Sequence, residues 1–245
     1  MLKDADIREP LFDFLEKTYG KVRILEEKII GSSRADVMMV VPEGLYGIEI
    51  KSDADSYTRL AGQVKDYDKY YDFNMVAVGT SHAGHIEEHV PEYWGIITVE
   101  ETAEGPDFYL LRKARPNPKM RWIRKLEILW RPELAAFQEM NAMPKYRQES
   151  KAFVIGKIAE RIEKGKIDEQ TARTQISSLL FERDYTAIKK TISNYKKAEA
   201  ARPKRPMDPV VKLKLMVGNP FFGGFSVTIR PGRRKRRKNA GSRRG

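Results

Sequence analysis

The sequence predicts an α/β protein, in which a mixed sheet with flanking helices is followed by a small all-α module and a basic, disordered tail. Three observations predict this class. Helical and strand periodicities follow one another in the order α-β-β-β-α-β over roughly the first hundred residues. Strand signals almost stop after residue 120, and the last residues of the chain are rich in Lys and Arg.

The first elements are a helix and three strands. Leu11, Leu15 and Tyr19 recur at helical spacing, and Gly20 ends the helix. The next stretches are rich in Val and Ile and are bounded by turn residues, which is typical of strands. The predicted elements are a helix over 7–19 and strands over 22–30, 35–41 and 46–51.

A second helix separates these strands from the rest of the sheet. Leu60, Val64, Tyr67 and Tyr71 form one stripe along it. Short apolar runs after it predict further strands. In order, we predict a helix over 56–72, a strand over 75–78, a short helix near 83–90, and strands over 95–99 and 108–111. Such an order favours a mixed sheet with a helix on each side.

The second half of the chain reads as helical up to about residue 200. The segment Arg115-Pro116-Asn117-Pro118 is a plausible linker between the two halves. Helices are predicted over 132–140, 150–163, 168–181 and 184–199. We therefore predict three parts: a core over 1–115, a helical module over 120–200, and a linker with a polybasic tail over 201–245.

Composition narrows the function classes. The chain has 245 residues, of which 41% are hydrophobic and 33% charged, and it has no cysteine. Disulfides and thiolate metal sites are therefore excluded. No apolar run approaches the roughly 20 residues that span a bilayer, so no membrane partner is expected. We expect a cytoplasmic protein of a bacterial or phage-infected cell, or a nuclear one if the source is eukaryotic.

The positive charge is concentrated in the tail. The net charge is +12, and residues 230–245 hold nine basic residues and no acidic one, which leaves +3 for the rest of the chain. Polycationic tails bind nucleic acid through its phosphates, with little sequence preference. A solvated tail and a targeting signal are the alternative readings.

Two strands carry the most specific chemical signal. Asp36 enters the second strand, and Glu49 and Lys51 lie on the third. Residues two apart on a strand point to the same face, so Glu49 and Lys51 face one way while Ile48 and Ile50 face the other. Two carboxylates with an ammonium group beside them are the minimum set for metal-assisted cleavage of a phosphodiester.

These residues resemble the PD-(D/E)XK nuclease superfamily, which has the restriction-endonuclease-like fold. The resemblance covers about residues 7–100, and a little-characterised bacterial and phage group is the most similar part of the superfamily. It rests on Asp36, on Ile48-Glu49-Ile50-Lys51-Ser52-Asp53, on the Asp55-Ser56 and Arg59-Leu60 positions, and on Trp94-Gly95-Ile96-Ile97. Ala35 stands where the superfamily usually has a proline, a common departure. The resemblance implies an αβββαβ core.

The resemblance also implies roles for single residues. Asp36 and Glu49 would hold Mg²⁺, which Mn²⁺ would replace, and Lys51 would contact the attacking water or the phosphate. The main-chain carbonyl of Ile50 would be a further ligand. Glu9, on the first helix, is placed to complete the metal shell, with Glu26 and Glu27 as second choices. Gln63 and Tyr67 match a Gln-x-x-x-Tyr motif of exonuclease-type members, although Tyr67 also fits a plain core residue.

Several basic and polar residues are candidates for contacts with nucleic acid. Those within the body of the chain are Arg34, Ser52, Arg59, Arg147 and Lys151, and those in the tail are Arg233, Arg234, Lys235, Arg236, Arg237 and Lys238. Arg147 lies between two predicted helices and Lys151 at the start of the second, in an arrangement loosely similar to SAP-like DNA-binding segments. A plain helical scaffold explains the same pattern.

The sequence therefore predicts a Mg²⁺-dependent deoxyribonuclease acting in DNA repair, recombination, phage replication or defence. Two other functions remain open: a non-catalytic DNA-binding or structural protein of a nucleoprotein complex, and a Holliday-junction or flap resolvase. DNA is the expected partner, with RNA also open. A homodimer, and a protein complex formed through the C-terminal region, are further interactions that the sequence allows.

Overall fold

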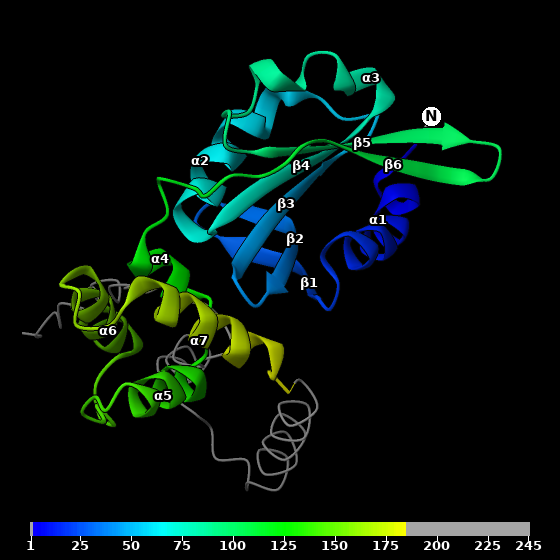
Figure 1. Ribbon diagram of the computed structural model, residues 1–245. Helices are drawn as coiled ribbons and strands as arrows, with labels where there is room; N and C mark the ends of the chain where they lie inside the picture. Colours follow the sequence, from blue (N-terminus) through cyan, green and yellow to red (C-terminus); the bar gives the residue numbers. More distant parts are fainter. Residues whose placement is uncertain (1, 185–245) are drawn as a thin grey trace, which may run out of the picture. The chain divides into compact units, whose positions relative to one another are not determined.

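The computed structural model describes residues 2–184. One compact unit spans Met1–Arg183, and it contains a mixed sheet and the helices around it (Figure 1). The second unit, Asp184–Gly245, lies almost entirely outside the described residues. The helix predicted over 184–199 falls there apart from its first residue, and so does the whole polybasic tail.

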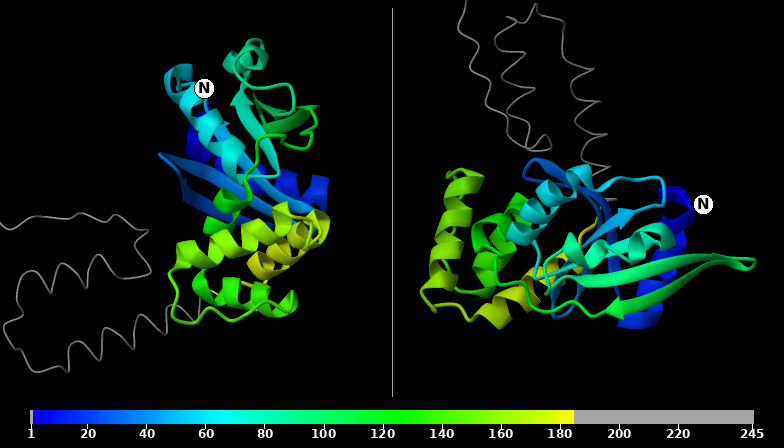
Figure 2. Two further views of the ribbon diagram at one scale, coloured as in Figure 1. Left: turned by 90° about the vertical axis from the view of Figure 1, so that its left-hand side faces the viewer. Right: turned by 90° about the horizontal axis from the view of Figure 1, so that it is seen from above.

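Six strands form the sheet, in the spatial order β1-β2-β3-β4-β5-β6. The first three pair antiparallel, β3, β4 and β5 pair parallel, and β6 returns antiparallel to β5. The long β5–β6 hairpin projects beyond the other strands (Figures 1 and 2). The strands are β1 (Arg23–Ile30), β2 (Ser33–Val41), β3 (Gly44–Lys51), β4 (Phe73–Gly79), β5 (Gly95–Thr102) and β6 (Gly105–Arg112).

Helices cover the two faces of this sheet, as predicted. Helix α1 (Asp4–Tyr19) packs Ile7, Leu11 and Leu15 on one face. Helix α2 (Leu60–Tyr70), entered through the short 3₁₀ turn η1 (Tyr57–Arg59), packs on the other. The sheet residues alternate between the two hydrophobic clusters, because successive side chains on a strand point to opposite faces.

The other helices extend the α2 side of the molecule. Helices α4 to α7 gather near one end of the sheet (Figure 1) and share a hydrophobic cluster with α2. Their bounds are α4 (Trp122–Glu127), α5 (Arg131–Met140), α6 (Lys151–Glu163) and α7 (Glu169–Phe181). Ser150 and Asp168 cap α6 and α7 by accepting main-chain N–H groups, as Ser and Asp commonly do.

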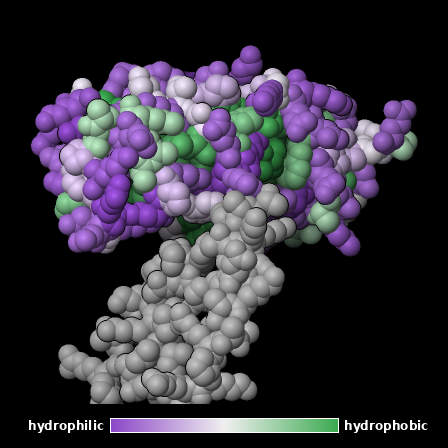
Figure 3. All heavy atoms as spheres, turned by 90° about the horizontal axis from the view of Figure 1, so that it is seen from below, coloured by the Kyte–Doolittle hydropathy of each residue, from purple (hydrophilic) through white to green (hydrophobic). Residues whose placement is uncertain are grey.

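Two differences from the sequence prediction concern short elements. Residues 83–90 do not form one helix: α3 (Thr80–Ala83) is followed by the separate 3₁₀ turn η2 (Ile86–Glu88). Helix α4 was not predicted, because six residues hold too few turns for a periodic pattern. No helix within residues 2–184 is long and apolar enough to cross a membrane. Seen from below, the surface is largely hydrophilic, with separate hydrophobic areas (Figure 3).

Candidate active site

The candidate site begins where the pairing of β2 with β3 ends. Val37 pairs with Ile48, so the next positions along the two strands, Asp36 and Glu49, are neighbours. The Asp36 carboxylate accepts the main-chain N–H of Ile50 at 2.9 Å. The side chain thus takes a hydrogen bond that would otherwise belong to the ladder, and this fixes the carboxylate beside Glu49.

Glu49 and Lys51 share one face of the sheet, as predicted, and it is the face that α2 covers. Both side chains are buried, and the Lys51 Nζ atom lies 2.9 Å from Glu49 Oε1. Ile48 and Ile50 point the other way, into the cluster that α1 covers. A buried carboxylate and a buried ammonium are stable together because each compensates the charge of the other.

Gln63 and Tyr67 approach Glu49 from α2. They are four residues apart, so they share one face of the helix. The Tyr67 hydroxyl donates to Glu49 Oε2 at 2.7 Å, and the Gln63 amide donates to Glu49 Oε1. The same hydroxyl accepts the main-chain N–H of Asp36 at 3.1 Å. Tyr67 is fully buried, and it is both a core residue and the bridge between the two carboxylate-bearing strands.

The close approach of α2 to β3 depends on Gly47. A Cβ atom at this position would lie 2.2 Å from Cδ2 of Tyr71 and 2.7 Å from Cδ1 of Tyr67. Real Cβ atoms do not approach rings so closely. The absent side chain therefore lets the tyrosines of α2 lie directly against the strand that carries Glu49.

We expect the substitution Gly47→Ala to destabilise the protein by about 1–3 kcal/mol, the usual cost of overpacking a core. It also pushes the Tyr67 ring away from Glu49. Urea unfolding gives the free energy of unfolding, and Gly62→Ala is the matched control. Gly62 lies in α2, and a Cβ atom added there would meet nothing within 4 Å, so alanine stabilises the helix by up to about 1 kcal/mol. Equal stabilities of the two variants would contradict this account.

The Asp36 carboxyl group is a weaker acid than an ordinary aspartate. Burial raises the pKa of its carboxyl group to about 7, and the neighbouring charge of Glu49 adds to the rise. The N–H of Ile50 and the guanidinium of Arg8 oppose the rise by favouring the charged form. Burial also raises the pKa of Tyr67 well above its usual value, so its hydroxyl remains a neutral donor.

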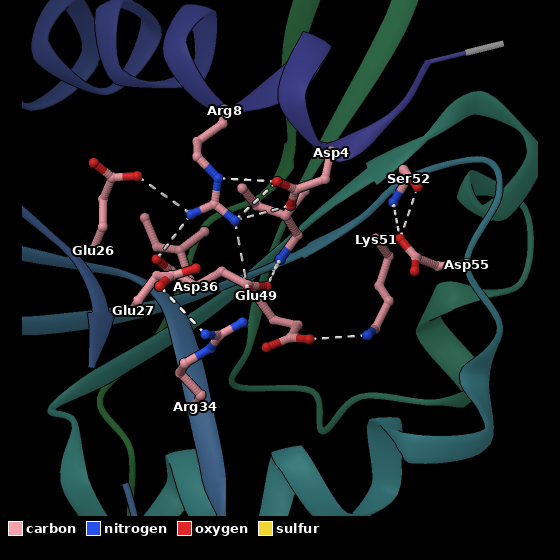
Figure 4. A network of polar contacts seen from close by, with 12 residues as sticks. Asp4, Arg8, Glu26, Glu27, Arg34, Asp36, Glu49, Lys51, Ser52 and Asp55 are labelled. Atoms are coloured by element: carbon pink, nitrogen blue, oxygen red, sulfur yellow. Dashed lines mark hydrogen bonds and ion pairs between the residues drawn. The ribbon is translucent and has the colours of Figure 1, made fainter. Parts of the chain in front are cut away.

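Arg8, not Glu9, reaches the site from α1 (Figure 4). Its guanidinium donates to the main-chain carbonyl of Asp36 at 3.2 Å and lies 3.9 Å from the Asp36 carboxylate. Asp4 and Glu26 bind the same guanidinium. Glu9 is exposed, because its position lies across the helix from the buried stripe of α1. The structure therefore does not bring Glu9 to Asp36, and the sequence reading missed Arg8.

The body residues expected to contact nucleic acid differ in exposure and in their contacts. Arg34 and Arg59 are exposed, and Arg34 lies 3.3 Å from Glu27 across a solvent-facing ion pair. Ser52 is buried and donates its hydroxyl to Asp55. Arg147 lies in the loop before α6, and Lys151 is the first residue of α6. The Lys151 ammonium donates to the carbonyl of Glu127. The tail residues Arg233 to Lys238 lie outside the described part.

The donor set of the two strands fits a hard divalent cation such as Mg²⁺. The neighbouring charge of Glu49 contributes to the raised pKa of Asp36, and a cation between the two carboxylates would relieve that repulsion. The Oε1 atom of Gln63 is buried and has no hydrogen-bond partner in the described region. Proteins commonly hold Mg²⁺ with one or two carboxylates plus waters and substrate phosphates. Within residues 2–184, no cluster of three or more His, Asp or Glu side chains could hold a metal.

Comparisons with known proteins give one family. The family model described as "Bacteriophage P4 protein cII" matches residues 1–200. Protein cII of Enterobacteria phage P4 is 23% identical over 138 residues, which are 55% of this chain and 52% of that protein. The match thus spans about half the length of this relative.

A distant structural similarity was also found. SfsA of Pyrococcus furiosus, solved in complex with Ca²⁺, is 15% identical and is matched over 42% of this chain and 59% of its own. Its TM-score of 0.28 is too low to carry an argument about fold or site.

Proposed function

The chain belongs to the family of bacteriophage P4 protein cII, and we propose that it is a metal-dependent deoxyribonuclease with a restriction-endonuclease-like core. The observation that carries the proposal is the pairing of Asp36 with Glu49 on adjacent strands, with Lys51 beside them on the same buried face. A buried charged group is costly unless it is used or compensated. Glu49 and Lys51 are buried and Asp36 is partly buried, and three charged groups gathered at one place favour catalysis over a purely structural role.

The proposed roles follow from the contacts of each residue. Asp36, Glu49 and the carbonyl of Ile50 would hold Mg²⁺, which supplies an activated water and neutralises charge at the phosphate. Lys51 offers its ammonium to the oxygen on which negative charge develops. Tyr67 and Gln63 orient Glu49 through hydrogen bonds to both of its oxygens. Arg8 holds the main chain of Asp36 in place.

Incubation of the purified protein with supercoiled, linear and single-stranded DNA tests the proposal. We expect cleavage with Mg²⁺ or Mn²⁺ and none with EDTA. The double variant Glu49→Gln/Lys51→Met, purified in the same way, reports any contaminating nuclease. Preference for branched DNA would favour a resolvase. Tight binding without cleavage in either metal would overturn the proposal and favour the non-catalytic binding protein.

The raised pKa of Asp36 predicts how Mg²⁺ binding depends on pH. A carboxyl group must lose its proton to bind the cation, so affinity falls below pH 7, by about tenfold per unit. The metal-free protein shows the reverse trend in stability. Its folded state holds the Asp36 proton more tightly than the unfolded state does, so this stabilisation is present at low pH. It is lost as the pH rises from 3.8 to about 7.

Thermal unfolding at pH 5.5 to 8.5, with EDTA and with a series of Mg²⁺ concentrations, measures both trends. The Asp36→Asn variant is the control, because it has no proton to lose at this position. Its Mg²⁺ response should be weak and independent of pH. A wild-type Mg²⁺ midpoint that is the same at pH 6 and pH 8 would contradict the assigned role of Asp36.

A further inference from the structure

A second charged feature lies across α2 from the candidate active site. A cavity of about 1060 Å³ opens between α2, the segment before α4, α4 itself, and the ends of α6 and α7. Figure 1 shows α4 beside the C-terminal end of α2. We call this cavity the basic groove. Its charged lining consists of Lys65, Lys69, Lys119, Arg121, Arg124 and Arg173, against Asp68, Glu163 and Glu169.

The groove has six basic and three acidic side chains, and of the acids Glu163 is exposed. Lys65 and Arg121 are exposed, and neither side chain has a hydrogen bond or ion pair in the described region. Lys119 keeps 61% of its side chain exposed, with its ammonium 3.4 Å from a carboxylate oxygen of Asp68. By contrast, Asp68 is buried and accepts from Asn74, Tyr93 and Trp94. Glu169 is paired with Arg173. The face that a ligand meets is therefore positive.

The groove is held in shape before any ligand arrives. The side-chain amide of Asn117 donates to the carbonyls of Asp68 and Tyr71 at the end of α2. The main-chain N–H of Arg121 donates to the carbonyl of Lys69. These bonds fix the segment that carries Lys119 and Arg121 against the helix that carries Lys65. A preformed arrangement of cations binds with less loss of conformational entropy.

We propose that the basic groove binds the sugar–phosphate backbone of DNA, without reading its sequence. Its accessible side chains are lysine and arginine, which contact phosphate oxygens and carry no base preference in that role. The groove lies on the opposite side of α2 from Gln63 and Tyr67. Because binding here needs no metal and no bond cleavage, it goes beyond the proposed nuclease function and is tested separately from it.

Fluorescence anisotropy of a labelled duplex in EDTA, over a range of salt concentrations, tests the groove with the full-length chain. The test variant is Lys65→Gln/Lys119→Gln/Arg121→Gln. The control is Lys17→Gln/Lys113→Gln/Lys145→Gln, three exposed residues away from the groove that remove the same charge. Each lost phosphate contact lowers the log–log salt slope by about 0.9, so we expect the test variant to lose about 2–3 units. Equal slopes and affinities for the two variants would overturn the proposal.

Site-specific cross-linking gives a second, independent measurement. The chain has no cysteine, so Lys65→Cys introduces a single thiol at the groove. We expect it to form a disulfide with duplex DNA that carries an activated thiol tether on its backbone, releasing the tether's thiol leaving group. Lys17→Cys, on the far face of the sheet, is the control. Cross-linking that is no faster at position 65 than at position 17 would also overturn the proposal.

Discussion

We expect the substitution Asp36→Asn to remove the proposed metal-dependent cleavage, with a loss of at least about 10²–10³-fold in rate. That is the usual cost of deleting one group that stabilises charge in a transition state. An asparagine oxygen can still accept the N–H of Ile50, so the strands remain joined. The repulsion between Asp36 and Glu49 disappears as well. We therefore expect the inactive variant to be at least as stable as the wild type at pH 8 in EDTA. Plasmid nicking and thermal unfolding give the two readouts.

Glu9→Gln is the control. It tests the metal-binding role that the sequence predicts for Glu9 against the exposed position that the structure gives it. It also removes one carboxylate, but from an exposed position on α1. We expect normal cleavage from this variant. Loss of cleavage in Glu9→Gln, or full activity in Asp36→Asn, would contradict the site as described. Unfolding of Asp36→Asn would point to a structural role for the aspartate instead.

The substitution Lys125→Ala is expected to destabilise the protein by about 3–5 kcal/mol, because it removes the buried ammonium that binds the buried carboxylate of Asp72. Lys125 is fully buried and its ammonium binds Oδ2 of Asp72, which also accepts the main-chain N–H of Leu45 at 2.8 Å. Arg173 lies 3.5 Å from the other oxygen. One carboxylate therefore connects β3, α4 and α7.

Urea unfolding of three variants measures this effect. The double variant Lys125→Met/Asp72→Asn removes both charges and should be more stable than Lys125→Ala, since no unpaired charge remains. Lys157→Ala is the control. Lys157 lies 3.4 Å from Glu160 in an exposed pair, and its loss should cost no more than about 1 kcal/mol. A loss below about 1 kcal/mol in Lys125→Ala would contradict the role of the buried pair.

Much of the site could be predicted from local sequence. Strand alternation places Glu49 and Lys51 on one face of β3. Helical spacing places Gln63 and Tyr67 on one face of α2. The antiparallel order of β2 and β3 then brings Asp36 to Glu49. Each of these relations needs only the period of an element or the pairing of neighbours in the chain. Tyr67 illustrates the same point, since its place in an apolar stripe and its hydrogen bond to Glu49 both hold.

Residues that depend on the exact rotation of a helix could not be predicted in this way. Glu9 and Arg8 are adjacent in the chain. A rotation of α1 about its axis by one residue position decides which of the two side chains reaches Asp36. The spacing of Asp4 and Arg8, which form an ion pair, was the one available signal. The basic groove was also missed. Its cations come from α2, the segment before α4, α4 itself and α7, and no stretch of sequence shows them together.

The buried pair of Asp72 and Lys125 has a consequence for how such genes diverge. Exchange of gene segments between relatives that breaks the chain between β6 and α4 would separate a carboxylate from its only buried lysine partner within residues 2–184. A hybrid that inherits Asp72 without Lys125 is expected to have a less stable fold, because the buried carboxylate has lost its lysine. In exchanges with a relative that lacks either residue, viable crossovers should therefore fall outside residues 72–125, or be followed by compensating substitutions.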